Sequence, residues 1–228
     1  VLRVYTTLSF ACHQIAPLMP EFNKLYPNLK VEYHTGTGPL RTLDSTMDIA
    51  IYPYDMQDCS MVARRIAQSR WVLCASPDYL EQHGVPEKPS DLLKHSCMNF
   101  AMDVPCNNWP VWDAQEEKFT RVSVPPTASA TDAEMLLALG LAGAGIVRMY
   151  EYHVARHLER GELVQLFPTE QNNHQQAIHA IYQSRRHLTP RARIYLDFLE
   201  EKFSGFRDTW QVSKPAQATP ALRLTRAA

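Results

Sequence analysis

The chain has 228 residues, of which 45% are hydrophobic and 21% are charged, as in an ordinary globular protein. This length suffices for one large domain or for two smaller lobes, each with its own core. The formal net charge of −1 argues against a surface that coats nucleic acid, and no apolar run approaches the roughly 18 residues of a membrane span.

The first part of the chain alternates predicted strands with one helical segment. The helical segment begins at Ser9, and its regular part starts near Ala16 because Pro17 and Pro20 disturb the first turn. Strands are predicted over residues 2–6, 29–33, 48–52 and 70–75. This order is typical of an α/β lobe with a parallel sheet.

The strand over 70–75 stops at a Ser-Pro break. A short helix around Tyr79 follows and turns at Gly84, and Ser90 is expected to cap another short helix. Such a unit could carry the chain from one α/β lobe to another.

The second part of the chain predicts a second lobe. A capping box that starts at Thr131 and ends at Glu134 opens a helix, a charged helix covers 151–160, and a last helix starts at Thr189. Strands are predicted over 96–100, 109–112, 119–124, 146–149, 163–166 and 177–182. From Ser213 the apolar periodicity ends, so residues 213–228 are expected to be disordered.

Several motifs occur in an order and spacing that resemble the effector-binding domain of LysR-type transcriptional regulators. The resemblance covers Leu2 to about Phe203. The motifs that carry it are Val62-Ala63-Arg64-Arg65-Ile66-Ala67, Leu73-Cys74-Ala75-Ser76-Pro77-Asp78-Tyr79-Leu80, Ala133-Glu134, Gly143-Ala144-Gly145-Ile146-Val147 and Gly161-Glu162-Leu163-Val164.

The resemblance implies an α/β, two-lobe periplasmic-binding-protein-like (type II) fold with two crossover strands. On this basis, residues 1–75 plus 183–210 form effector-binding lobe I, and residues 77–177 form lobe II. The crossovers are expected at Leu73–Ser76 and Ala177–Tyr182. The DNA-binding domain is absent from this chain and is expected upstream of Val1.

Motifs for catalysis, metals or cofactors are weak. Gly140–Gly145 lies between a helix and a strand, the reverse of a dinucleotide-binding loop. His153 and His157 have a spacing that could hold a metal, but the charged residues between and around them favour a solvated face. Glu116-Glu117 is expected to diverge in a turn, and Arg185–His187 to lie on the surface. We therefore predict no catalytic residue, no metal and no cofactor.

Small polar side chains follow the strand ends, where open α/β sheets bind ligands. At helix starts such hydroxyls can also act simply as N-caps, and for Thr131 alone the cap is the preferred interpretation. As a set they are predicted to line one cleft between the lobes, and the resemblance supports this. The predicted effector-binding residues are Thr7, Ser9, Thr35, Thr37, Tyr52, Asn99, Ser129 and Thr131.

The resemblance implies that the chain binds a small-molecule effector and couples this to transcription regulation. The implied partners are a second copy of the chain, in a homodimer or homotetramer, and DNA only through an upstream winged helix-turn-helix domain, with no membrane contact. The five scattered cysteines (Cys12, Cys59, Cys74, Cys97 and Cys106) indicate free thiols in a reducing cytoplasm. The alternatives are a free-standing solute-binding protein of the same fold and an enzyme, which would need a titratable pair at the cleft.

Overall fold

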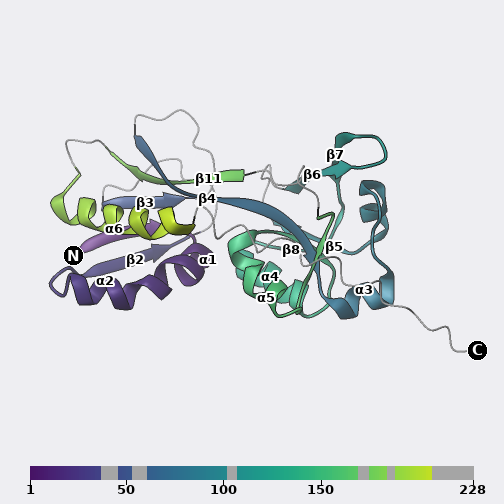
Figure 1. Cartoon of the computed structure of the whole chain (residues 1–228), viewed down its shortest axis with the longest axis horizontal. Helices are drawn as coiled ribbons and strands as arrows, with labels where there is room; N and C mark the ends of the chain where they lie inside the picture. Colours follow the sequence, from purple (N-terminus) through teal and green to yellow (C-terminus); the bar gives the residue numbers. More distant parts are fainter. Residues whose placement is uncertain (37–45, 53–60, 102–106, 169–174, 184–187, 207–228) are drawn as a thin grey trace, which may run out of the picture.

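The computed structural model describes residues 1–36, 46–52, 61–101, 107–168, 175–183 and 188–206. Figure 1 shows two lobes side by side, with β4 (Val62–Ala75) running from one to the other and β11 (Gln175–Tyr182) beside the first part of β4. In the described part, the strands of the main sheet follow the order β2-β1-β3-β11-β4-β9-β5-β8, and β10 lies beside β4. Their bounds are β1 Leu2–Thr6, β2 Val31–Thr35, β3 Ile49–Tyr52, β5 Cys97–Phe100, β8 Pro126–Ala130, β9 Ile146–Tyr150 and β10 Val164–Leu166.

The first lobe holds β1, β2, β3, β11 and the beginning of β4, with helices on one face. Its helical elements are α1 (Leu8–Phe10), a π-helical turn (Ala11–Ile15), a 3-10 turn (Ala16–Leu18), α2 (Met19–Leu25) and α6 (Pro190–Phe206). Val4 and Ile51 of the sheet share a buried core with Phe22 of α2 and Tyr195 of α6. The predicted irregular start of the first helical segment is confirmed, since a proline cannot donate a backbone hydrogen bond.

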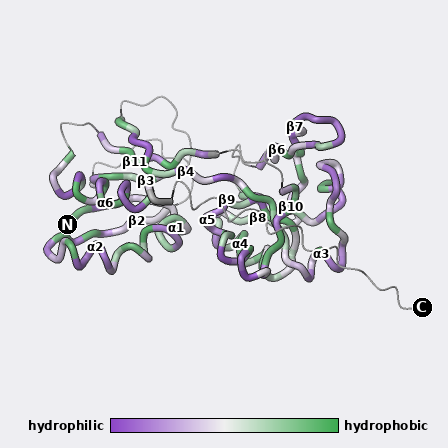
Figure 2. The backbone as a smooth tube through the Cα atoms, viewed as in Figure 1, coloured by the Kyte–Doolittle hydropathy of each residue, from purple (hydrophilic) through white to green (hydrophobic). Residues whose placement is uncertain are grey.

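The second lobe has layers on both faces of its sheet. One face is covered by α3 (Pro77–His83), the 3-10 helix Pro89–Lys94 and the hairpin of β6 (Asn108–Asp113) and β7 (Lys118–Ser123), and the other by α4 (Ala133–Leu141) and α5 (Glu151–Glu159). Because alternate strand residues point to opposite faces, Leu73 packs under the hairpin and Cys74 under α4. Figure 2 shows hydrophilic residues at the hairpin turn and hydrophobic residues along the interior strands.

Strand β4 is much longer than the predicted strand over 70–75. It pairs with β11 from Val62 to Arg70 and with β9 from Trp71 to Cys74. The chain therefore passes between the lobes at Arg70–Trp71. The expected crossover at Leu73–Ser76 is wrong, because Leu73–Ala75 already pair with β9 and β10 of the second lobe and Ser76 caps α3. The residues before Arg70 are mostly charged and polar, so their sequence pattern did not predict a strand. They form one because they pair with β11.

Two local predictions need correction, and one strand was not predicted. Asp132, rather than Thr131, caps α4, since its Oδ1 accepts from the backbone N–H of Glu134 at 2.8 Å. Ser90 lies inside its short helix, which is capped by the Asp91 carboxylate accepting from Lys88 N–H at 3.2 Å. β8 was not predicted, because its residues have weak strand preference, and it forms by pairing with β5.

The free-thiol prediction is confirmed for Cys12, Cys74 and Cys97. Burial raises the pKa of Cys74 and of Cys97 to about 12. Predictions for Cys59, Cys106, Thr37, Arg185–His187 and 213–228 lie outside the described residues. Among the helices of the described ranges, none combines the length and apolar character that crossing a membrane requires.

Candidate functional site

The carboxyl ends of strands from both lobes point toward each other. In the first lobe β1 runs parallel to β2 and β3, and in the second lobe β5 runs parallel to β8 and β9. Strand β4 runs in the same direction as β3, because β11 lies antiparallel between them, and antiparallel to β9. The ends of β1–β3 are thus directed to the second lobe, and those of β5, β8 and β9 to the first. Open α/β sheets bind ligands at such ends.

The turn after β1 brings two predicted residues together. The Oγ atoms of Thr7 and Ser9 lie 3.4 Å apart, and Thr7 Oγ1 also accepts from the backbone N–H of Phe10 at 3.3 Å. Thr7 is therefore the N-cap of α1, while Ser9 is buried at 4% exposure. The preceding Thr6 has a buried hydroxyl that has no hydrogen-bond partner among the described residues.

The other two described candidates of the first lobe differ in exposure. Thr35 is exposed at the end of β2, and the following Gly36 donates its N–H to the carbonyl of Thr6 at 3.2 Å. Tyr52 is buried at 2% exposure and packs with Ala50 and Ile181 on the sheet face opposite the helices. The Tyr52 ring is therefore part of the packed interior of the first lobe.

In the second lobe, Asn99 and Ser129 lie opposite each other in the β5–β8 register. Asn99 Nδ2 donates to the carbonyl of Val124 at 3.2 Å, and its buried Oδ1 has no partner among the described residues. Ser129 and Thr131 are exposed. The lobe therefore offers an exposed hydroxyl beside an unpaired amide oxygen.

Arg148 is a candidate that the sequence analysis missed. It is buried at 7% exposure in β9, opposite Leu73 of β4, and its Cζ lies 4.4 Å from the ring centroid of Trp71. Trp71 stacks on Tyr150 at 3.8 Å between ring centroids. A single arginine within the otherwise apolar run Ile146–Met149 was the available signal, because a charge is rarely buried without a specific contact.

The lobes also touch through their helices. His13 Nε2 lies 3.0 Å from Glu134 Oε1, and the rings of His13 and His153 meet edge to face at 5.7 Å. Burial lowers the pKa of His153 to about 3, so this imidazole is neutral at pH 7. The prediction of a solvated face is wrong for His153, because α5 turns this residue toward the first lobe.

The pair His153 and His157 does not form a metal centre. His157 Nδ1 instead contacts Glu162 Oε2 at 2.5 Å. The described residues contain no group of three His, Cys, Asp or Glu side chains that could hold a metal ion.

Comparisons with known proteins agree with this fold. A family model for the LysR substrate binding domain matches residues 1–204. The HTH-type transcriptional regulator CrgA of Neisseria meningitidis serogroup C (strain 8013) is 31% identical over 205 residues, which cover 90% of this chain and 68% of CrgA. The HTH-type transcriptional activator AaeR of Escherichia coli (strain K12) is 31% identical over 203 residues, which cover 89% of this chain and 64% of AaeR.

Solved structures agree with these matches. The regulatory domain of CrgA from Neisseria meningitidis superposes with a TM-score of 0.80 at 30% identity, covering 89% of this chain and 98% of that domain. The regulatory domain of AphB in Vibrio vulnificus gives a TM-score of 0.72 at 20% identity, covering 88% of this chain and 98% of that domain, which indicates a shared fold.

Proposed function

The chain belongs to the LysR substrate-binding domain family, and from this membership we propose that it binds a small-molecule effector between its two lobes. It is the effector-binding domain of a LysR-type regulator, and the comparisons give no support to a free-standing solute-binding protein. The observation that carries the proposed site is the opposed set of strand ends. We propose lobes over residues 1–75 plus 183–210 and residues 77–177, with Trp71–Cys74, which pair with β9, assigned to the second lobe.

The proposed site joins Thr7, Ser9, Thr35, Thr37 and Tyr52 of lobe I to the second lobe's Asn99, Ser129 and Thr131. A ligand that contacts both lobes favours a closed form by its differential contacts, each hydrogen bond contributing about 0.5–1.5 kcal/mol. Such a shift is the means by which effector binding would change the affinity of a regulator for DNA.

The binding partners that we propose for this chain rest on its similarity to CrgA. The chain spans about two thirds of CrgA, a regulator named for its helix-turn-helix. We therefore propose that an upstream winged helix-turn-helix domain contacts DNA, that the effector domains assemble as a homodimer or homotetramer, and that the protein works in the cytoplasm without enzymatic activity. The near-neutral charge of this chain predicts that it does not bind operator-length duplex tightly by itself.

A thermal-shift screen against small carboxylates, amino acids and aromatic metabolites tests the site. A ligand at 100 times its Kd stabilises the fold by about 2.7 kcal/mol, which raises the Tm by several degrees. Thr35→Trp and Ser129→Trp place bulk at exposed positions on opposite lobes, whereas Ser9 is buried and a large replacement there would disturb packing.

Both tryptophan variants should lose the stabilisation by a ligand found in the screen. Ser204→Trp, on the exposed face of α6, is the matched control and should keep it. Stabilisation that survives in both Thr35→Trp and Ser129→Trp would place the ligand elsewhere.

A further inference from the structure

The first turn of α5 joins the second lobe to α1 and to the π-helical turn that follows α1. The rings of Phe10 and Tyr152 meet edge to face with their centroids 5.5 Å apart, and those of His13 and His153 do so at 5.7 Å. Phe10 and Tyr152 also share the buried core that holds the helices of the first lobe. These two ring pairs are called the lobe joint below.

His153 is the polar group of the lobe joint whose burial is least compensated. Its side chain is 4% exposed, and neither ring nitrogen has a hydrogen-bond partner of normal geometry among the described residues. Burial and the charge of His13 lower its pKa to about 3, and the Tyr150 backbone offsets this only in part. A buried imidazole without a partner disfavours the conformation that buries it, and a charged one does so far more. The lobe joint therefore requires a neutral His153.

The neighbouring contact between His13 and Glu134 responds to acid in the opposite sense. Protonation of His13 strengthens its 3.0 Å contact with the Glu134 carboxylate. These side chains are 27% and 34% exposed, however, and solvent weakens an ion pair at such positions. A charge on His13 also repels a charge on His153. The buried imidazole therefore decides the response of the lobe joint to acid.

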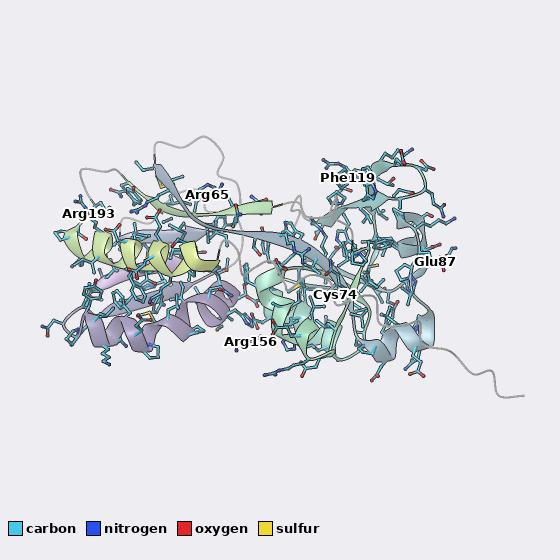
Figure 3. All side chains as sticks on the ribbon, in the orientation of Figure 1. Arg65, Cys74, Glu87, Phe119, Arg156 and Arg193 are labelled. Atoms are coloured by element: carbon cyan, nitrogen blue, oxygen red, sulfur yellow. The ribbon has the colours of Figure 1, made fainter. Side chains whose placement is uncertain are left out.

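The other titratable and charged groups around the lobe joint supply no counter-charge to His153. They are Cys12, Asp132, Glu134, Arg156, Glu151 with Arg70, and His157 with Glu162. Cys12 stays a neutral thiol at pH 7, because burial and the two carboxylates of α4 and its cap raise its pKa. Arg156 lies at the exposed surface of the second lobe (Figure 3). Of the charged groups that the structure describes, His13 is the one that acts on the pKa of His153.

We propose that the lobe joint is an acid-sensitive switch, in which protonation of His153 separates α5 from the π-helical turn and lets the two lobes move apart. Imidazole is the side chain that gains a proton between pH 8 and pH 5 once water reaches it. The separated form takes up this proton and the joined form excludes it. The ratio of separated to joined form should rise about thirtyfold from pH 8 to pH 5, since the pKa of His153 is near 6.5 in one and about 3 in the other.

Separation at the lobe joint also acts on the proposed effector site. Thr7 caps α1, and Ser9 lies in the same short helix as Phe10. Movement of this helix away from α5 withdraws both hydroxyls from the second lobe. Weaker effector binding in acid therefore rests on the proposed function. The switch itself does not, and the experiment below needs no ligand, so the two proposals can fail separately.

Hydrogen exchange followed by mass spectrometry tests the switch on this chain. Protection factors, corrected for the intrinsic pH dependence of exchange, are compared at pH 8 and pH 5 for residues 8–15 and 151–159. Strands β1 and β5 are the references within each sheet. His153→Leu and His153→Phe remove the titrating group with side chains of two shapes. His157→Leu, which removes a histidine one turn further along α5, is the matched control.

In the wild type, residues 8–15 and 151–159 should be less protected than β1 and β5, as in an opening that leaves the sheets folded. Their opening equilibrium should rise about thirtyfold from pH 8 to pH 5 in the wild type and in His157→Leu, and less than about threefold in the His153 variants.

Equal protection of the lobe joint and the two strands in the wild type would show that His153 meets water only on unfolding, and would overturn the inference. An opening equilibrium that is the same at both pH values in the wild type, or that rises as steeply in the His153 variants, would overturn it as well. The wild-type comparison can refute the switch whether or not the variants fold.

Discussion

His13 and Glu134 join the two lobes across 121 positions of sequence, with Nε2 of the imidazole 3.0 Å from Oε1 of the carboxylate. The imidazole comes from the π-helical turn after α1 and the carboxylate from the first turn of α4. If a ligand closes the lobes as proposed, the closure acts on this polar contact.

Removal of this contact should cost little stability. Glu134→Ala should lower the free energy of unfolding by about 0.5–1 kcal/mol, because both side chains are about one quarter to one third exposed and solvent weakens the pair. Urea unfolding measures this, and a double-mutant cycle with His13→Ala isolates the coupling. Glu159→Ala, at an exposed position of α5, is the control. A coupling free energy of zero would show that the pair does not hold the lobes together.

Burial of His153 predicts a pH-dependent stability. In the unfolded chain the imidazole binds a proton below its usual pKa of 6.5, while in the folded protein it stays neutral down to a pKa of about 3. Stability should therefore fall as the pH drops from 6.5 toward 3, by up to about 1.4 kcal/mol per pH unit from this group.

Urea unfolding at several pH values checks this for wild type and His153→Leu. The leucine variant should lose less stability on acidification. Val154→Ala, which removes buried volume from the same helix but no titrating group, should lower stability equally at each pH. Identical pH slopes in wild type and His153→Leu would contradict the assignment.

Gly145 is required where α4 leads into β9. A Cβ atom there would collide with the carbonyl oxygen of Ser96, which accepts from Ile146 N–H at 2.8 Å. Gly145→Ala should therefore lower the free energy of unfolding by more than about 2 kcal/mol. Gly161 has a φ of 69°, but a Cβ atom there meets open space. Gly161→Ala should therefore lower the free energy of unfolding by only about 1 kcal/mol. Equal losses in thermal unfolding would remove the steric explanation.

Dimer formation is expected to involve α4. In the proposed homodimer, residues 15–26 of one protomer lie beside residues 131–141 of its partner, related by a two-fold axis. Met135 is 54% exposed on α4, so Met135→Glu should shift the protein toward monomer in light scattering at micromolar concentration. Val85→Glu, at another exposed apolar position, should leave the assembly unchanged. A monomeric wild type at that concentration would contradict the dimer.

Local sequence signals predicted much of the secondary structure. The strand over 2–6, the turn at Gly84 with φ of 81° and the helix capped by Thr189 all follow from periodicity, glycine freedom and a hydroxyl cap. Signals that agree over a few neighbouring residues need no distant partner. The same reasoning placed hydroxyl and amide side chains at strand ends, and the family motifs indicated the two-lobe architecture.

Features that depend on contacts between distant segments could not be predicted from local signals. The length of β4 depends on pairing with β11 and β9, and β8 exists as a strand because β5 lies beside it. His153 lies on a helix that is charged by sequence, yet it is buried, where its ring meets those of His13 and Tyr152.

Local pattern alone predicted most of the elements other than β8, the family resemblance and a set of candidate polar residues. Contacts between distant segments set which polar groups are buried, bring Arg148 over Trp71 beneath the hairpin, and turn the strand ends of the two lobes toward each other. Burial and desolvation, which set the cost of a charge and the pKa of an imidazole, depend on residues distant in the chain.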